Sequence, residues 1–270
     1  MAPPAEPFFL GSGAGARFCL FHRPAGPVHA AVLYVAPYGE EMNCARRMSQ
    51  QLARALAARG VAVLVIDLHG CGDSAGDSGE AHWDSWLADL AAGCDWIVGQ
   101  TGVVPALLGV RLGALLALDY ARQASHRIDK VVLWQPVASG AAFLSQLLRQ
   151  RVASEMLNGA APDAQTGDSG TLEIAGYELA PALAKALGTL QIGPLLAPDC
   201  AVHWFEIVPE AGRAVAPGTA RLLESRRQQG PGLHFEQLVG APFWALPGAP
   251  GCPALIEASC AVFEKVRDAV

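Results

Sequence analysis

The sequence predicts an α/β protein with a mostly parallel central sheet that is covered by helices on both faces. Short apolar runs alternate with longer segments whose apolar residues recur at helical spacing, a rhythm typical of right-handed β-α-β crossovers. In addition, 52% of the 270 residues are hydrophobic, and the mean hydropathy is +0.28. Such values fit strands that are buried on both sides.

The expected strands begin with an antiparallel hairpin at 8–10 and 18–21, followed by apolar runs at 31–36, 61–68, 103–108, 131–134, 201–208 and 234–239. Helices are expected at 44–58, 83–98, 114–123, 219–228 and 254–266.

The alternation stops between residues 138 and 198. Helical segments at 143–157 and 179–190 flank a polar, glycine-rich stretch at 159–170. We interpret 138–198 as a helical cap inserted above the carboxyl ends of the strands. Residues 1–137 and 199–270 then form one core, which suits the length of the chain.

Composition excludes several classes of protein. A formal charge of −6 argues against a nucleic-acid surface, which needs clustered Lys and Arg. Because no stretch reaches about 18 consecutive apolar residues and the first residues lack a basic segment, we expect a cytoplasmic protein with no transmembrane segment. The seven cysteines form no C-x-x-C pair, so neither a disulfide framework nor a zinc site is indicated, and no cofactor is expected.

One motif carries most of the functional information. Gly109-Val-Arg-Leu-Gly113 has the frame of a G-x-S-x-G nucleophile elbow, with Arg111 where the serine would stand. An apolar strand precedes it and a helix follows, which is the context that gives this motif its meaning. Arginine cannot attack a carbonyl.

Together with this motif, Asp67-Leu-His-Gly-Cys-Gly-Asp-Ser74 resembles the D-x-x-G-x-G-x-S loop of the α/β-hydrolase superfamily. More narrowly, the chain resembles the exosortase A system-associated hydrolase 2 family, on segments 37–47, 67–77, 109–118, 133–136 and 240–244. The resemblance implies an α/β-hydrolase fold and a bacterial cytoplasmic protein linked to exopolysaccharide production and the sorting of PEP-CTERM proteins.

A hydrolase of this fold needs a nucleophile, then an acid, then a histidine along the chain. These positions fall at Arg111, near Gly212-Arg213, and at Ala241 or Pro242, with Glu210 as the closest carboxylate. All three roles are therefore vacant by sequence.

Arg111 requires an anion nearby, because a buried unpaired cation at the amino end of a helix is unfavourable. Glu40 and Glu41 are the leading internal partners, and Asp67 is another. A carboxylate, phosphate or sulfate of a ligand could take the same place.

The backbone amides of Leu112 and Tyr38 correspond to the oxyanion hole of the fold and could still hold a carbonyl or anionic ligand. Trp134, Trp244 and Tyr38 either line that cavity or pack in the core.

Non-standard catalysts are the remaining alternative. Cys71 with His69 is one candidate dyad, and Ser139 after a strand end is another. The other six histidines share no spacing typical of a metal site.

Three hypotheses follow. The preferred one is a pseudo-hydrolase with an acyl or anionic small-molecule ligand in a pocket around Arg111. The second is an ester or thioester hydrolase with an unrecognised nucleophile. The third is an interaction or scaffold protein, for which we expect a closed, dry pocket and either a large exposed hydrophobic patch or a dimer interface, such as that of a homodimer.

Overall fold

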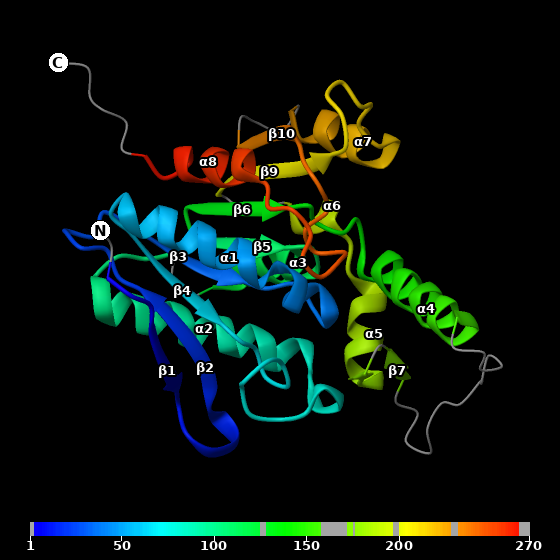
Figure 1. Cartoon of the computed structure of the whole chain (residues 1–270), viewed down its shortest axis with the longest axis horizontal. Helices are drawn as coiled ribbons and strands as arrows, with labels where there is room; N and C mark the ends of the chain where they lie inside the picture. The colour runs from blue at the N-terminus through cyan, green and yellow to red at the C-terminus, as the bar shows by residue number, and fades with distance from the viewer. Residues whose placement is uncertain are drawn as a thin grey trace.

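In the computed structural model, residues 3–124, 128–157, 172–174, 176–196, 200–227 and 232–264 are described. Within them, eight strands form one sheet in the order β1-β2-β4-β3-β5-β6-β9-β10 (Figure 1). Strands β1 and β2 pair antiparallel, β2 also pairs antiparallel with β4, and all other neighbours pair parallel. The predicted mostly parallel sheet with a leading hairpin is confirmed.

The strands of this sheet lie close to the expected runs. Their bounds are β1 (Glu6–Leu10), β2 (Arg17–His22), β3 (Ala30–Val35), β4 (Val61–Ile66), β5 (Ala106–Val110), β6 (Lys130–Trp134), β9 (Ala201–Val208) and β10 (Leu233–Val239).

Helices cover both faces of the sheet (Figure 1). One hydrophobic cluster packs α1 (Glu40–Ala58) and α8 (Pro253–Ala261) on one face, and another packs α2 (Trp83–Thr101) and α3 (Leu112–Gln123) on the other. The helix α7 (Pro217–Arg227) contacts β10, and two single 3-10 turns lie at Gly13–Gly15 and Ser78–Glu80. Positions 228, 265 and 266 of the expected helices lie outside the described residues.

The strand before the elbow is shifted relative to its prediction. It was expected at 103–108, whereas β5 runs from Ala106 to Val110. Pro105 has no backbone N–H to donate to a neighbouring strand, and Val104 is exposed. Gly109 and Val110 instead pair with Leu133 and Trp134 of β6. The sheet therefore continues up to the residue before Arg111.

The first helix starts earlier than predicted. Its expected start was residue 44, but α1 begins at Glu40, directly after Gly39 at φ +64°. Glu40 and Glu41 therefore lie in the first turn, where the positive end of the helix dipole favours carboxylates. The early start turns Glu41 into the protein and leaves Glu40 in solvent.

The segment between β6 and β9 forms the expected helices and an unexpected hairpin. Helices α4 and α5 and strand β7 lie beyond one end of the sheet (Figure 1). The glycine-rich stretch 159–170 lies outside the described residues, and the division into core and cap at 138–198 stays a prediction. The elements of this segment are α4 (Gly140–Leu157), β7 (Leu172–Ile174), β8 (Tyr177–Leu179), α5 (Pro181–Thr189) and α6 (Ile192–Leu195).

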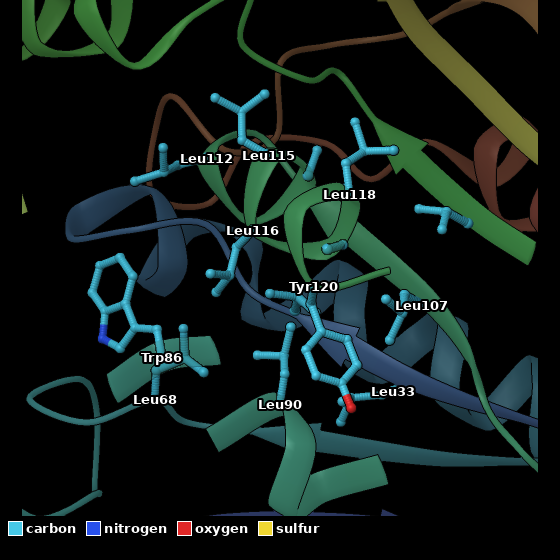
Figure 2. Close-up of a cluster of buried hydrophobic side chains, with 14 of the residues drawn as sticks. Leu33, Leu68, Trp86, Leu90, Leu107, Leu112, Leu115, Leu116, Leu118 and Tyr120 are labelled. Atoms are coloured by element: carbon cyan, nitrogen blue, oxygen red, sulfur yellow. The ribbon is translucent and has the colours of Figure 1, made fainter. Parts of the chain in front are cut away.

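Helix α3 is embedded in the largest cluster of apolar side chains. Figure 2 shows Leu112, Leu116 and Tyr120 on successive turns of this helix, above Trp86 and Leu90 of α2. All five are buried. The elbow is thus held on a helix that packing fixes in place.

Among the described residues, none of the helices combines the length and apolar composition needed to cross a membrane.

Two glycines allow the close approach at the elbow. A Cβ atom on Gly113 would lie 2.4 Å from the carbonyl oxygen of Ala36 and 2.6 Å from that of Val35. A Cβ atom on Gly109 would lie 2.4 Å from the carbonyl oxygen of Gly113. Contacts this short with backbone atoms cannot be relieved by a side-chain rotation. The glycine frame of the motif is therefore a packing requirement, whichever residue lies between.

We expect the substitution Gly113→Ala to lower the free energy of unfolding by about 1–3 kcal/mol, the usual cost of overpacking a tight core. Gly99→Ala is the matched control, because Gly99 is an exposed residue of α2 with open space around its Cα. That change should raise stability by about 0.5–1 kcal/mol through helix propensity. Urea unfolding measures both, and a shift of the two variants in the same direction would contradict the packing argument.

Candidate functional site

Arg111 occupies a sharp bend between β5 and α3. Its backbone lies at φ 55° and ψ −115°, a conformation that costs a non-glycine residue about 1–3 kcal/mol. Its N–H donates to the carbonyl of Trp134 at 3.0 Å. Gln135, at φ 45°, is the other non-glycine residue with positive φ among those described. The bend has kept the geometry of an elbow although it carries no nucleophile.

The guanidinium of Arg111 is bound on several sides. Its Nε lies 3.2 and 3.3 Å from the two carboxylate oxygens of Glu41, and its Nη2 lies 3.1 Å from Oε1 of the same residue. Nη2 also donates to Oε1 of Gln146 at 3.1 Å, and Nη1 donates to the carbonyl of Gln135 at 3.4 Å. Both side chains of the ion pair are 10% exposed. Most donors of Arg111 are therefore already in use.

The Glu41 carboxyl feels two opposing effects. Burial raises its pKa above the usual value, since the charged form has lost its hydration, whereas the charge and hydrogen bonds of Arg111 and a hydrogen bond from Gln146 lower it. Burial is the larger effect. The attraction between Arg111 and Glu41 is therefore largely spent in offsetting the loss of hydration of the two charges, and the pair adds little net stability.

An aromatic ring from the segment after β10 lies beside Arg111. Trp244 follows β10 and comes two residues after the expected base position at Pro242. The carbon Cζ of Arg111 lies 5.3 Å from the centre of the Trp244 ring, a cation–π arrangement. Glu210, the carboxylate closest to the expected acid position, is exposed to solvent. The positions that the sequence predicts for the acid and the base thus supply no proton-transfer group that contacts Arg111 in the described residues.

A cavity of about 210 Å³ opens beside this pair. Arg111 itself is not among its described lining residues, but Glu41, Gln146 and Trp244 line the cavity and contact the guanidinium. Its walls are mostly apolar and aromatic side chains, with carboxylates and amides between them. The lining residues are Tyr38, Gly39, Glu40, Glu41, Gln146, Leu147, Gln150, Ile174, Tyr177, Leu179, Trp244 and Ala245.

Tyr38 and Leu112 belong to a second, much smaller cavity. Its volume is about 10 Å³, room for at most about one water molecule. Cys71, Leu68 and Trp86 line the same space. Tyr38 borders both cavities, whereas Leu112 is among the described lining residues of the smaller one and not of the larger one.

The sequence matches the family model described as serine aminopeptidase, S33, over residues 26–188, which is more than half of the chain. The chain belongs to this family. Among curated proteins, none matches the sequence.

Solved structures of the same architecture superpose on nearly the whole chain. Est1E from Butyrivibrio proteoclasticus with bound ferulic acid has a TM-score of 0.63 at 14% identity, covering 94% of this chain and 97% of that one. DcsB in complex with its substrate analogue has a TM-score of 0.62 at 18% identity, covering 95% and 97%. The thioesterase domain from the curacin biosynthetic pathway has a TM-score of 0.56 at 17% identity, covering 96% and 99%. At these identities the likeness confirms the α/β-hydrolase fold alone.

The candidate dyad does not have the chemistry of an α/β-hydrolase nucleophile. Burial, together with the charges of Asp67 and Asp89, raises the pKa of the Cys71 thiol to about 12, so the thiolate is scarce at neutral pH. No hydrogen bond joins Cys71 to His69 within the described part of the chain. The His69 ring lies against Gly76, and its Nδ1 is buried with no partner.

The hydroxyl of Ser139 has a structural role. Its Oγ accepts a hydrogen bond from the backbone N–H of Ala142 at 3.1 Å, in the first turn of α4. The backbone of Ser139 also forms a single β-bridge with Gln191. This is the position of a capping side chain.

Two other expected site residues lie elsewhere. Asp67 binds Nη2 of Arg46 at 3.3 Å and the backbone N–H of Asp73 at 3.1 Å, so it holds the glycine-rich loop and not Arg111. Trp134 packs edge-on against Tyr34 and Phe243 in the core, away from the described lining of either cavity. Its indole Nε1 donates to Ser259 Oγ at 2.9 Å.

Gln146 and Tyr177 are among the site residues that sequence reasoning missed. Both come from the segment between β6 and β9, and neither belongs to a recognisable motif. The hydroxyl of Tyr177 accepts a hydrogen bond from Asn43 Nδ2 at 2.8 Å, which joins β8 to α1. Among the described residues, no group of three or more potential ligands is placed to hold a metal.

We expect Arg111→Met to lower the free energy of unfolding at pH 7 by about 3 kcal/mol, because Glu41 would stay buried without its partner. Loss of Arg111 removes the main group that lowers the Glu41 pKa, so this pKa rises further above 4.5 in the folded state. A carboxyl with a raised folded pKa stabilises the fold below its unfolded pKa and loses that contribution as the pH rises. The deficit should therefore shrink on acidification, measured by urea unfolding at pH 7 and pH 5.

The double variant Glu41→Gln/Arg111→Met is the control. It leaves no charge buried and should recover most of the lost stability at pH 7. An Arg111→Met variant as stable as the wild type at pH 7 would show that the pair is not coupled in this way.

Proposed function

We propose that this α/β-hydrolase-fold protein is a pseudo-hydrolase, which binds a small and largely apolar ligand beside the Arg111–Glu41 pair without cleaving it. The supporting observation is that pair: a side chain that cannot form an acyl intermediate lies at the elbow, and a buried carboxylate holds it there. Loss of the nucleophile together with its base removes the proton transfers that serine attack requires.

The cavity supports a binding role. Apolar and aromatic side chains with a few convergent polar groups are the usual lining of small-molecule sites. A cavity of about 150 Å³ is enough for benzene. The present volume of about 210 Å³ thus suits a body somewhat larger than a benzene ring. Of the acyl and anionic ligands expected from the sequence, the acyl type fits better, because Glu41 already neutralises Arg111.

The resemblance to the exosortase A system-associated hydrolase 2 family supports a finer placement. On that basis the protein acts in the cytoplasm of a bacterium, in exopolysaccharide production and PEP-CTERM protein sorting. Its ligand would then be a small molecule of that system, and no nucleic acid or cofactor would be involved.

Methyl phenylacetate tests binding and cleavage with one neutral ester. We expect ligand-observed NMR to show saturable binding and chromatography to find no more phenylacetate than buffer produces. Leu147→Trp, which fills the cavity, should weaken binding at least tenfold, whereas Leu148→Trp on the exposed side of α4 should not. A saturable signal that is insensitive to Leu147→Trp would place the ligand elsewhere.

The alternative of an active ester or thioester hydrolase has a distinct outcome in the same experiment. Phenylacetate formed well above buffer, and abolished by Cys71→Ala or Ser139→Ala, would overturn the proposed function. For the scaffold alternative, the expected result is no binding of the ester together with a homodimer in sedimentation equilibrium.

A further inference from the structure

The mouth of the large cavity carries a carboxylate without a countercharge. Glu40 lines the cavity and is exposed, and its Oε2 accepts a hydrogen bond from the neutral amide of Asn43 at 3.0 Å. Within the described residues, Glu40 makes no ion pair. The amino end of α1 offers about half a positive charge, which cannot cancel a full carboxylate and is shared with Glu41.

Two cations near the cavity are already paired with carboxylates. Arg111 is bound to Glu41, and Arg46, whose charge acts on Tyr177, is bound to Asp67. Among the described lining residues there is no Lys, Arg or His. Among the described lining residues, the carboxylate of Glu40 is therefore the charge that has no ion-pair partner.

Aromatic rings form much of the wall. Tyr38, Tyr177 and Trp244 all border the cavity, and aromatic ring faces attract cations. Trp244 already holds one cation in this way, since Cζ of Arg111 lies 5.3 Å from its ring centre. The phenolic groups stay neutral at physiological pH, because burial raises the pKa of both Tyr38 and Tyr177.

We infer that the cavity selects a ligand with a small apolar or aromatic body and a protonated amine, with the ammonium group beside Glu40 at the mouth. This inference rests on the proposed function and names its ligand class. The apolar body lies against Leu147 and the aromatic walls. A carboxylate of the same size would face Glu40 and could reach Arg111 only by displacing Glu41.

Three ligands of similar size and different charge test this selection at pH 7. They are 2-phenylethylamine, 2-phenylethanol and phenylacetate, compared by ligand-observed NMR titration at low and high salt. We expect the amine to bind about threefold to fivefold more tightly than the alcohol, in keeping with one exposed ion pair. The carboxylate should bind at least tenfold more weakly than the amine, and salt should reduce these differences.

Glu40→Gln should bring the amine and the alcohol to equal affinity. Glu173→Gln is the matched control, because Glu173 is exposed on β7 and is not among the cavity's lining residues. It should keep the preference for the amine.

The outcomes separate this inference from the proposed function. Tighter binding of phenylacetate than of the amine, or an amine preference that survives Glu40→Gln, would overturn the ligand class while the binding role stands. Failure of all three compounds and of methyl phenylacetate to bind would overturn both. Binding of methyl phenylacetate with equal affinity for the amine and the alcohol would also refute the selection.

Discussion

A guanidinium and a carboxylate, each about nine-tenths buried, meet where β5 turns into α3. Several unfavourable terms act at this point: the backbone of Arg111 lies in a sparsely populated region, a cation lies at the amino end of a helix, and two charges have lost their hydration. They are offset by the hydrogen bonds that Arg111 donates to Glu41, Gln146 and Gln135 and by the ring of Trp244. If either Arg111 or Glu41 were replaced by an uncharged residue, the remaining charge would stay buried without its partner. The ion pair of Arg111 and Glu41 therefore fixes the positions of the side chains around it, Gln146 and Trp244, and neutralises the charge of Arg111.

The elbow and its chemistry are physically separate. The glycines at 109 and 113 are required because β5, α3 and β3 approach within the space of a Cβ atom, and this holds for any residue at position 111. The hydrogen bond from the Arg111 amide to Trp134 likewise involves only backbone. The backbone geometry of the elbow is thus compatible with a cation at its central position in a chain of the serine aminopeptidase S33 family.

The sequence predicts the sheet, its hairpin and the vacancy at position 111, because each depends on local pattern: apolar runs, helical spacing and a glycine frame. It leaves open whether Glu40 or Glu41 binds Arg111. Adjacent residues on a helix point about 100° apart, so the answer depends on where α1 begins, and Gly39 with its positive φ sets that start. Gln146 was missed for another reason. Its amide comes from α4, 35 residues along the chain from Arg111, and only tertiary packing brings the two together.

An arginine at a vacant catalytic position does not by itself make an anion site. What a ligand meets is the sum of the fixed charges that face it, and the partners of Arg111 line the cavity whereas Arg111 is not among its described lining residues. Glu41 cancels its charge at contact distance, where the Coulomb interaction is largest. The charge that remains belongs to Glu40, which the early start of α1 puts in solvent at the mouth. Although Glu40 and Glu41 are adjacent in the sequence, Glu41 thus neutralises Arg111 inside the protein, whereas Glu40 is left to interact with a ligand. The buried pair of Arg111 and Glu41 holds one side of the cavity in place, and the unpaired carboxylate of Glu40 makes the opening of the cavity negatively charged.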